Sequence, residues 1–245
     1  MPEQKSLARY HITRGSTKSI GVFADSSDSA FFSMTLKGIQ AAAWRRGYAS
    51  IISLLPDNGS AAVLLSTTAH SFDRSSFDGV VSMDNVGAGY MAAEHLVRQG
   101  CRRPAMVCGK PLRSIDQHRY KGFCQALQDY RLPLLPCDIV TAEMIRVMNP
   151  LPDGLFFTDD YHAVDCMNSL RDACIDVPGD VAVITVNSHQ VASLVTPALT
   201  TIDFTGFVFG ERAASQLLEQ PVRGRPRTTL VPPVLAVRQS SLKSR

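Results

Sequence analysis

Short apolar runs alternate along the chain with longer segments whose apolar residues recur at helical spacing. Ile20 to Ala24 and the β-branched run Val181 to Val186 have the length and composition of buried parallel strands. Phe31 to Gly47 has apolar residues on one helical face and ends in two arginines and a glycine, a pattern typical of a helix end. This alternation predicts an α/β protein in which crossover helices connect the strands of a parallel sheet.

The same periodicity predicts the remaining elements. Further helices are expected over Asn85 to Gln99, Tyr120 to Tyr130, and from Asp159-Asp160 to Cys174, with Asp160 as the N-cap of the last one. Further strands are expected over Ala49 to Leu55, Ala61 to Ser66, Val80 to Met83, Ala105 to Cys108, Leu155 to Phe157 and Leu199 to Ile202.

Three stretches carry a resemblance to a known family. They are Lys18-Ser19-Ile20-Gly21-Val22, Gly89-Tyr90-Met91-Ala92-Ala93-Glu94-His95-Leu96, and the strand, turn and second strand from Val181 to Ile202. In this order they resemble the effector-sensing part of LacI/GalR transcription regulators. The resemblance implies an α/β fold of two Rossmann-like lobes with parallel sheets, of the periplasmic-binding-protein-like type I, trimmed relative to the family.

The resemblance also implies a division of the chain. Residues 1–19 would be a hinge remnant or tail, residues 20–109 and 204–222 the N-terminal lobe, and residues 110–203 and 223–245 the C-terminal lobe. Leu7-Ala8-Arg9 already looks like the family's hinge, and no helix-turn-helix head precedes it. Specific DNA binding is therefore expected only through a head that this sequence lacks.

Two segments are shorter than the family pattern requires. Only Pro56 to Ser60 separate two expected strands, although a complete βαβ unit takes about 30 residues. Either the sheet is trimmed there, or Asn58-Gly59 forms a tight hairpin that turns the next strand antiparallel. Between Leu132 and Leu155, four prolines leave room for little helix beyond Ala142 to Met148.

Composition narrows the class of protein. The 245 residues are 45% hydrophobic and 19% charged, enough for a sizeable core, and the net charge is only +3. No signal peptide or membrane-spanning run is recognisable, which favours the cytoplasm. The six cysteines show no metal-binding spacing, so buried free thiols are expected rather than disulfides or a zinc site.

Ligands of open α/β sheets bind beyond the carboxyl ends of the strands, so the residues that follow each strand are the candidates. Asp25 and Phe31 follow the first strand, and by resemblance Phe31 matches an aromatic that stacks on the effector. Arg113 and Arg119 follow the strand Ala105 to Cys108. Arg119 matches the family's arginine three residues before a glycine-aromatic pair, and its guanidinium could grip two acceptors at once.

Three further candidates come from the resemblance. Asp159 matches a polar residue that faces the effector, and Asn187 stands where the family usually has an aspartate. Phe204 replaces a residue that is often polar and would make the pocket more aromatic. For Phe31 and for the arginines, a purely structural role in the core or in an ion pair is the competing interpretation.

The function that follows is a cytoplasmic, homodimeric LacI/GalR-like regulator, represented by its effector-sensing and dimerisation core, with a sugar- or purine-like ligand. The alternative is a stand-alone small-molecule or sugar-binding protein without a role at DNA. No motif of hydrolases, P-loop proteins, dinucleotide-binding enzymes or zinc proteases occurs, so no enzyme, cofactor or metal is expected, and no membrane partner.

Overall fold

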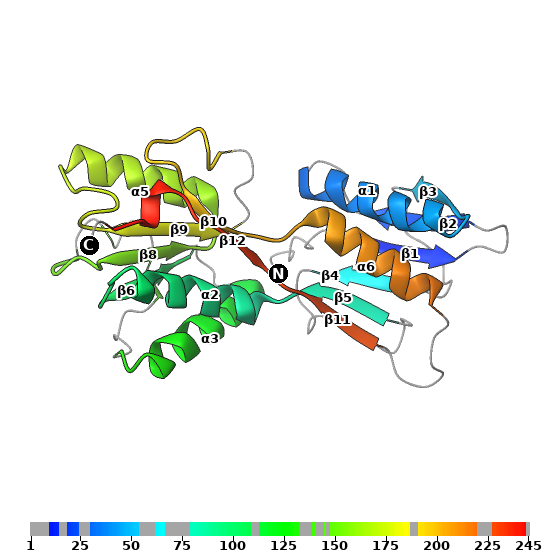
Figure 1. Ribbon diagram of the computed structural model, residues 1–245, viewed down its shortest axis with the longest axis horizontal. Helices are drawn as coiled ribbons and strands as arrows, with labels where there is room; N and C mark the ends of the chain where they lie inside the picture. The colour runs from blue at the N-terminus through cyan, green and yellow to red at the C-terminus, as the bar shows by residue number, and fades with distance from the viewer. Residues whose placement is uncertain are drawn as a thin grey trace, which may run out of the picture. The chain divides into compact units, whose positions relative to one another are not determined.

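A computed structural model gives the fold of the chain (Figure 1). It describes residues 10–14, 19–24, 30–53, 62–66, 79–108, 113–132, 139–140, 145, 148–186, 191–219 and 227–243. The chain forms two compact units, the first of Met1–Asp84 with Phe204–Pro232, the second of Asn85–Asp203 with Pro233–Arg245. Within the described residues, no helix is long and apolar enough to cross a bilayer.

The chain passes from one unit to the other at places that differ in part from those expected from the sequence. The change at residues 203 and 204 matches, but the first crossing follows Asp84 rather than residue 109, and the third follows Pro232 rather than residue 222. The reason is pairing: the strand at Arg227–Val231 lies parallel to the strand at Gly79–Met83, which keeps both in the first unit. The helix after Asp84 packs instead in the second unit.

The first unit contains a six-stranded sheet with the order β11-β5-β4-β1-β2-β3. Its strands are β1 (Tyr10–Arg14), β2 (Ser19–Ala24), β3 (Ala49–Ser53), β4 (Ala62–Ser66), β5 (Gly79–Met83) and β11 (Arg227–Val231). Helices α1 (Ala30–Arg45) and α6 (Gly206–Leu218) lie side by side on this sheet (Figure 1).

Strand β1 is the main departure from the expected fold. Residues 10–14 were expected in a hinge remnant, yet they form a strand between β2 and β4 and run antiparallel to both. The hairpin alternative for Asn58-Gly59 is wrong as well: β3 pairs with β2 at the sheet edge, and β4 pairs with β1 and β5. Because β1 is antiparallel to both β2 and β4, and β4 is parallel to β5, the first sheet is parallel except at β1.

The second unit contains another six-stranded sheet, with the order β12-β10-β9-β8-β6-β7. Its strands are β6 (Pro104–Val107), β7 (Ile139–Val140), β8 (Gly154–Phe157), β9 (Ala182–Val186), β10 (Thr200–Asp203) and β12 (Val234–Ala236). Only β12 is antiparallel to its neighbour. In the second shortened segment, the described residues are the two-residue β7, a helical residue at Ile145, and residues 148–153, which lead into β8.

Helices cover both faces of this second sheet. Helices α2 (Asn85–Arg98) and α3 (Ser114–Asp129) lie on one face and α5 (Asp160–Asp172) on the other (Figure 1). Strand β8 shows why its sequence is apolar throughout: Phe156 stacks on Phe123 of α3, while Leu155 and Phe157 join the core beneath α5. A strand covered on both faces loses the alternation of polar and apolar residues.

Helices α2 and α3 touch through their backbones. A Cβ atom on Gly89 would lie 1.7 Å from the carbonyl oxygen of Arg119, and one on Gly122 would lie 1.8 Å from that of Val86. Two glycines at facing positions therefore set the distance between these helices, since any side chain there would push them apart.

Gly89→Ala should destabilise the second unit by about 1–3 kcal/mol or more, because the added methyl group meets backbone that cannot move without separating the helices. Urea unfolding followed by far-UV circular dichroism measures the change. The matched control is Gln125→Ala on the exposed side of α3, which should change stability by less than about 0.5 kcal/mol. Equal effects of the two variants would contradict this packing role.

A buried polar network ties the C-terminal 3-10 helix η2 (Gln239–Ser241) to the second sheet. His95 Nε2 lies 2.8 Å from Ser241 Oγ, which lies 2.7 Å from Thr200 Oγ1. Ser240 Oγ donates to the carbonyl of Val183 at 2.6 Å and accepts from the backbone N–H of Thr200. Burial, and secondly the charge of Arg98, lower the pKa of His95 below its usual 6.5.

This shift predicts loss of stability in acid. The folded state holds His95 neutral and binds fewer protons than the unfolded chain, so stability is fully present above pH 6.5 and falls as the pH drops below it. Unfolding free energies at pH 7.5 and 5.5 should differ more for the natural chain than for His95→Gln. Equal differences for the two proteins would show that His95 does not titrate on unfolding in this range.

Candidate functional site

The second sheet has a topological switch point between β6 and β8. From β6 the chain passes to β7 on one side and then returns to β8, β9 and β10 on the other. Crevices at the carboxyl ends of the strands on either side of such a point are the usual ligand sites of open α/β sheets. Arg113 and Arg119 follow β6, and Thr158 and Asp159 follow β8, so four polar side chains belong to this edge.

Arg119 is the centre of this group. Its side chain comes from α3 and is only 2% exposed. Nε donates to Asn85 Oδ1 at 3.1 Å, and Nη1 donates to the carbonyl oxygen of Thr158 at 3.1 Å. The guanidinium thus connects the start of α2 with the end of β8, which fixes where its remaining donors point.

The spacing of Arg119, Gly122 and Phe123 has a physical explanation in this packing. Gly122 lets α3 approach α2, and Phe123 fills the core against Phe156 at a ring distance of 6.1 Å. One helical turn before Gly122, Arg119 is carried to the carboxyl edge of the sheet. The motif therefore combines a helix contact, a core anchor and a polar side chain at the candidate site.

Burial lowers the pKa of Arg119 to about 10, and neighbouring charges modify this value: Asp116 and Asp159 raise it, while Arg113 lowers it. The group stays protonated at neutral pH, in a place where little water solvates it. A buried cation of this kind favours an acceptor-rich ligand, because each hydrogen bond to it is charge-assisted.

Arg113 is engaged with its own helix. Its Nε and Nη2 donate to the two carboxylate oxygens of the fully buried Asp116, at 2.8 and 3.0 Å, and its backbone N–H reaches the same carboxylate. The hydrogen bond with Asp116 raises the pKa of Arg113, and the two residues form a capping box at the N-terminus of α3. The contacts of Arg113 are thus those of the structural role considered above, an ion pair at the start of a helix.

Asp159, not Asp160, is the N-cap of α5. It accepts from the backbone N–H of His162 at 2.9 Å and lies 2.5 Å from His162 Nδ1. The expectation for Asp160 was wrong by one residue, because Asp160 already has helical geometry. The carboxylate of Asp159 remains partly exposed, with 27% of the side chain accessible, and its charge acts on both Arg113 and Arg119.

Thr158 is a site residue that the sequence did not single out. Within the part of the chain that is described, its Oγ1 atom is buried without a hydrogen-bond partner, although its carbonyl accepts from Arg119. A buried hydroxyl without a partner costs free energy, so such atoms call for an explanation such as a ligand. Its position directly after β8 was the available signal. Asn85 was expected only as the first residue of a helix.

The other candidates divide between the first unit and undescribed positions. Phe31 is half-buried on α1 and packs against Phe209 of α6 at a ring distance of 5.6 Å. Phe204, just before α6, is fully buried. Asp25 and Asn187 lie outside the described residues. Phe31 thus has a contact within the core of its own unit, which is the structural role weighed above.

Comparison with protein families shows which family this fold belongs to. A periplasmic binding protein-like domain family matches residues 93–241, more than half of the chain. The chain belongs to this family. It has the form found in the effector-binding cores of LacI/GalR transcription regulators, as the following relatives show.

The HTH-type transcriptional repressor PurR of Haemophilus influenzae is 23% identical over 83% of this chain and 74% of its own length. A LacI family transcriptional regulator from Enterococcus faecium, solved with bound ribose, superposes with a TM-score of 0.69 at 19% identity, covering 93% of this chain and all of the other. The regulator CelR in complex with cellobiose has a TM-score of 0.69 at 18% identity, covering 88% of this chain and 80% of its own. The α/β fold with mostly parallel sheets expected from the sequence is confirmed.

Proposed function

We propose that this chain is the effector-sensing and dimerisation core of a cytoplasmic transcription regulator, and that its second unit binds a small sugar-like ligand at the carboxyl ends of β6 and β8. The observation that carries the proposal is the buried guanidinium of Arg119, held by Asn85 and Thr158 beside the buried Thr158 hydroxyl, which has no hydrogen-bond partner in the described part of the chain. Burying a cation and a hydroxyl costs free energy in a packed core, whereas a polar ligand can form hydrogen bonds with both groups.

The chemistry of the group suits hydroxyls and carbonyl oxygens. A guanidinium has five N–H donors in a rigid plane, and Arg119 uses two of them for Asn85 and Thr158. The hydroxyl of Thr158 can both donate and accept, and Asp159 offers a partly exposed carboxylate that accepts. Donors and acceptors side by side match adjacent hydroxyls of a sugar.

A purine-like effector is the second candidate ligand. It would need an aromatic wall to stack on, and Phe31 and Phe204 were expected to supply it. Phe204 is fully buried, and Phe31 packs on Phe209. Neither ring therefore offers a free face on which a purine could stack, so the polar group around Arg119 favours a sugar. Ribose and cellobiose in two solved relatives point the same way.

A stand-alone binding protein would use the same site, and the site alone does not separate it from a regulator. The separating experiment joins the chain to the helix-turn-helix head of a LacI-family relative and measures operator binding with and without the ligand. A regulator core changes operator affinity when the ligand binds, because the two binding events are coupled. Affinity that is identical with and without ligand would favour the stand-alone protein.

The Arg119 site predicts a particular response to mutation. A thermal-shift screen of pentoses, hexoses, disaccharides and purines should find a stabilising compound. Arg119→Ala should then weaken that compound by about 2–4 kcal/mol, since the ligand's acceptors lose charge-assisted hydrogen bonds. Arg119→Lys should recover little, because lysine lacks the planar fork. Calorimetry measures the affinities.

Thr158→Val keeps these measurements interpretable. Arg119→Ala also removes the hydrogen bonds to Asn85 Oδ1 and to the Thr158 carbonyl and so lowers stability, whereas Thr158→Val has nearly the same shape and removes only a hydroxyl that has no hydrogen-bond partner among the described residues. It should leave stability unchanged or slightly higher and still weaken the ligand. Unchanged affinity in both variants would place the ligand elsewhere.

Dimerisation is a separate prediction. The small residues Ala88, Gly89, Ala92 and Ala93 of α2 are buried inside the second unit, where Gly89 meets α3, so they are not exposed for contact with a second copy. Large apolar side chains that are at least 80% exposed occur instead at Trp44, Tyr161 and Leu194. Sedimentation velocity should give a dimer. A monomer at every concentration would contradict the proposal, because ligand binding to a monomer cannot change the spacing of two DNA-binding heads.

A further inference from the structure

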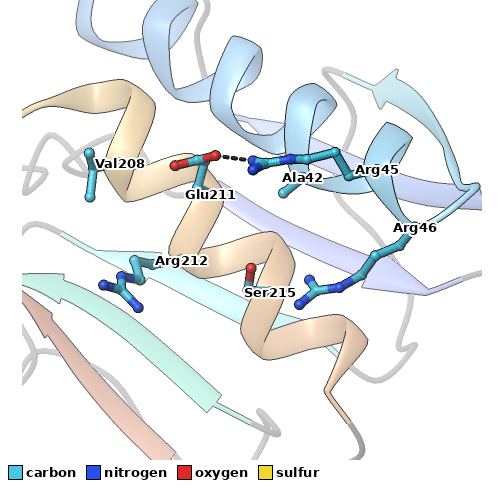
Figure 2. A pocket seen from close by; sticks show the side chains of 7 residues that line it. All are labelled: Ala42, Arg45, Arg46, Val208, Glu211, Arg212 and Ser215. Carbon is cyan, nitrogen blue, oxygen red and sulfur yellow. Dashed lines mark hydrogen bonds and ion pairs between the residues drawn. The ribbon is translucent and has the colours of Figure 1, made fainter.

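The first unit has a basic pocket between α1 and α6, which is unrelated to the proposed sugar site of the second unit. Its cavity volume is about 440 Å³, within the range of about 300–1,000 Å³ typical of small-molecule sites. Figure 2 shows the side chains that line it, from the last turns of α1 and the middle of α6. Those used below are Ala42, Arg45, Arg46, Glu211, Arg212 and Ser215.

The packing of the two helices explains the hollow. Earlier along the pair their backbones touch, since a Cβ on Gly38 would lie 2.0 Å from the Phe207 carbonyl and one on Gly210 would lie 2.0 Å from that of Thr35. Beyond this contact, the small residues Ala42 and Ser215 leave space between the helices, which longer side chains surround (Figure 2). The pocket therefore forms where the close backbone contact between α1 and α6 ends and the side chains between the two helices are small.

The charges around the pocket do not cancel. Arg45 forms an ion pair with Glu211, and its Nε also donates to the Ala41 carbonyl at 3.1 Å. Arg46 and Arg212 have no carboxylate partner in the described part of the chain. Figure 2 shows the guanidinium of Arg46 reaching toward Ser215 on the neighbouring helix. In this view the side chain of Arg212 extends from the opposite side of α6, so the two guanidinium groups that line the pocket lie on different sides of this helix (Figure 2).

We propose that this pocket binds a phosphate monoester. The two guanidinium groups without a carboxylate carry two positive charges, and a phosphate monoester carries about −1.5 to −2 at pH 7. Guanidinium forks match phosphate oxygens with two parallel hydrogen bonds, and Ser215 adds a hydroxyl donor. The phosphate can belong to a small metabolite or to a phosphorylated side chain of another protein.

A structural role for these arginines predicts something different. Basic side chains near the end of a helix stabilise its dipole, and Arg45, in the last turn of α1, also bonds to a helix carbonyl. Arg212 does not fit this role, since it lies in the middle of α6 rather than in its last turn. The ion pair of Arg45 with Glu211 orders one side of the pocket and leaves Arg46 and Arg212 for a ligand.

The test measures binding of three probes to the natural chain: inorganic phosphate, a hexose 6-phosphate and a phosphoserine peptide, each at constant ionic strength. The free hexose and the unphosphorylated peptide are their controls. Calorimetry gives affinities, and the single tryptophan, Trp44, lies next to Arg45 in sequence and provides a fluorescence readout. Binding of the phosphorylated probes alone is expected, and the tightest of them identifies the source of the phosphate.

Variants identify the pocket. Arg46→Ala with Arg212→Ala should weaken the phosphorylated probe about tenfold or more, since two charge-assisted contacts are lost. Lys121→Ala with Arg171→Ala removes the same charge from exposed positions of the second unit and should leave affinity nearly unchanged. Glu211→Gln should tighten binding several-fold, because it removes the negative charge of Glu211, the carboxylate among the described residues that line the pocket.

Three outcomes would overturn the proposal: equal binding of the phosphorylated probes and their unphosphorylated controls, equal losses in the two double variants, or weaker binding in Glu211→Gln. Failure here is distinguishable from failure of the sugar site. Arg119→Ala should leave phosphate binding intact, and the Arg46 and Arg212 variant should leave the sugar response intact, because the two sets of residues belong to different units.

Discussion

The close backbone approach of α2 and α3 is the constraint on which the candidate site depends. Gly89 lies against the carbonyl group of Arg119 itself, so the residue proposed to hold the ligand is also the residue at the helix contact. Any widening between the helices would move the guanidinium away from Asn85 and Thr158 together. Stability of the second unit and geometry of its polar edge are therefore coupled through two glycines.

Local patterns were sufficient to predict most elements, because strand and helix periodicity reflect burial of single segments. Helix α1 and strands β2, β5 and β9 lie where apolar spacing placed them, within one or two residues. The chain crossings could not be predicted in the same way. They depend on whether β11 pairs with β5, and that pairing joins residues about 150 positions apart.

The same distinction applies to the site. Arg119 could be predicted from a spacing of three residues, which one helix explains. Its partners could not, since Asn85 and Thr158 are 34 and 39 residues away and meet it only through the packing of α2 and the end of β8. Asp159 and Asp160 show the limit of local reasoning: either aspartate can cap a helix, and one residue of offset decides which carboxylate stays near the arginines.

The two units differ in how well their switch points can hold a ligand. In the second unit β6 and β8 are neighbours, so their carboxyl ends lie about 5 Å apart and the residues after them can meet. In the first unit β1 separates β2 from β4, which places those strands about 10 Å apart, and Tyr10 lies level with Ala24 and Leu65 at their carboxyl ends. The carboxyl ends of β2 and β4 are therefore farther apart than those of β6 and β8. This difference favours the second unit for the proposed effector site, while the phosphate pocket proposed for the first unit lies on its helix pair α1 and α6.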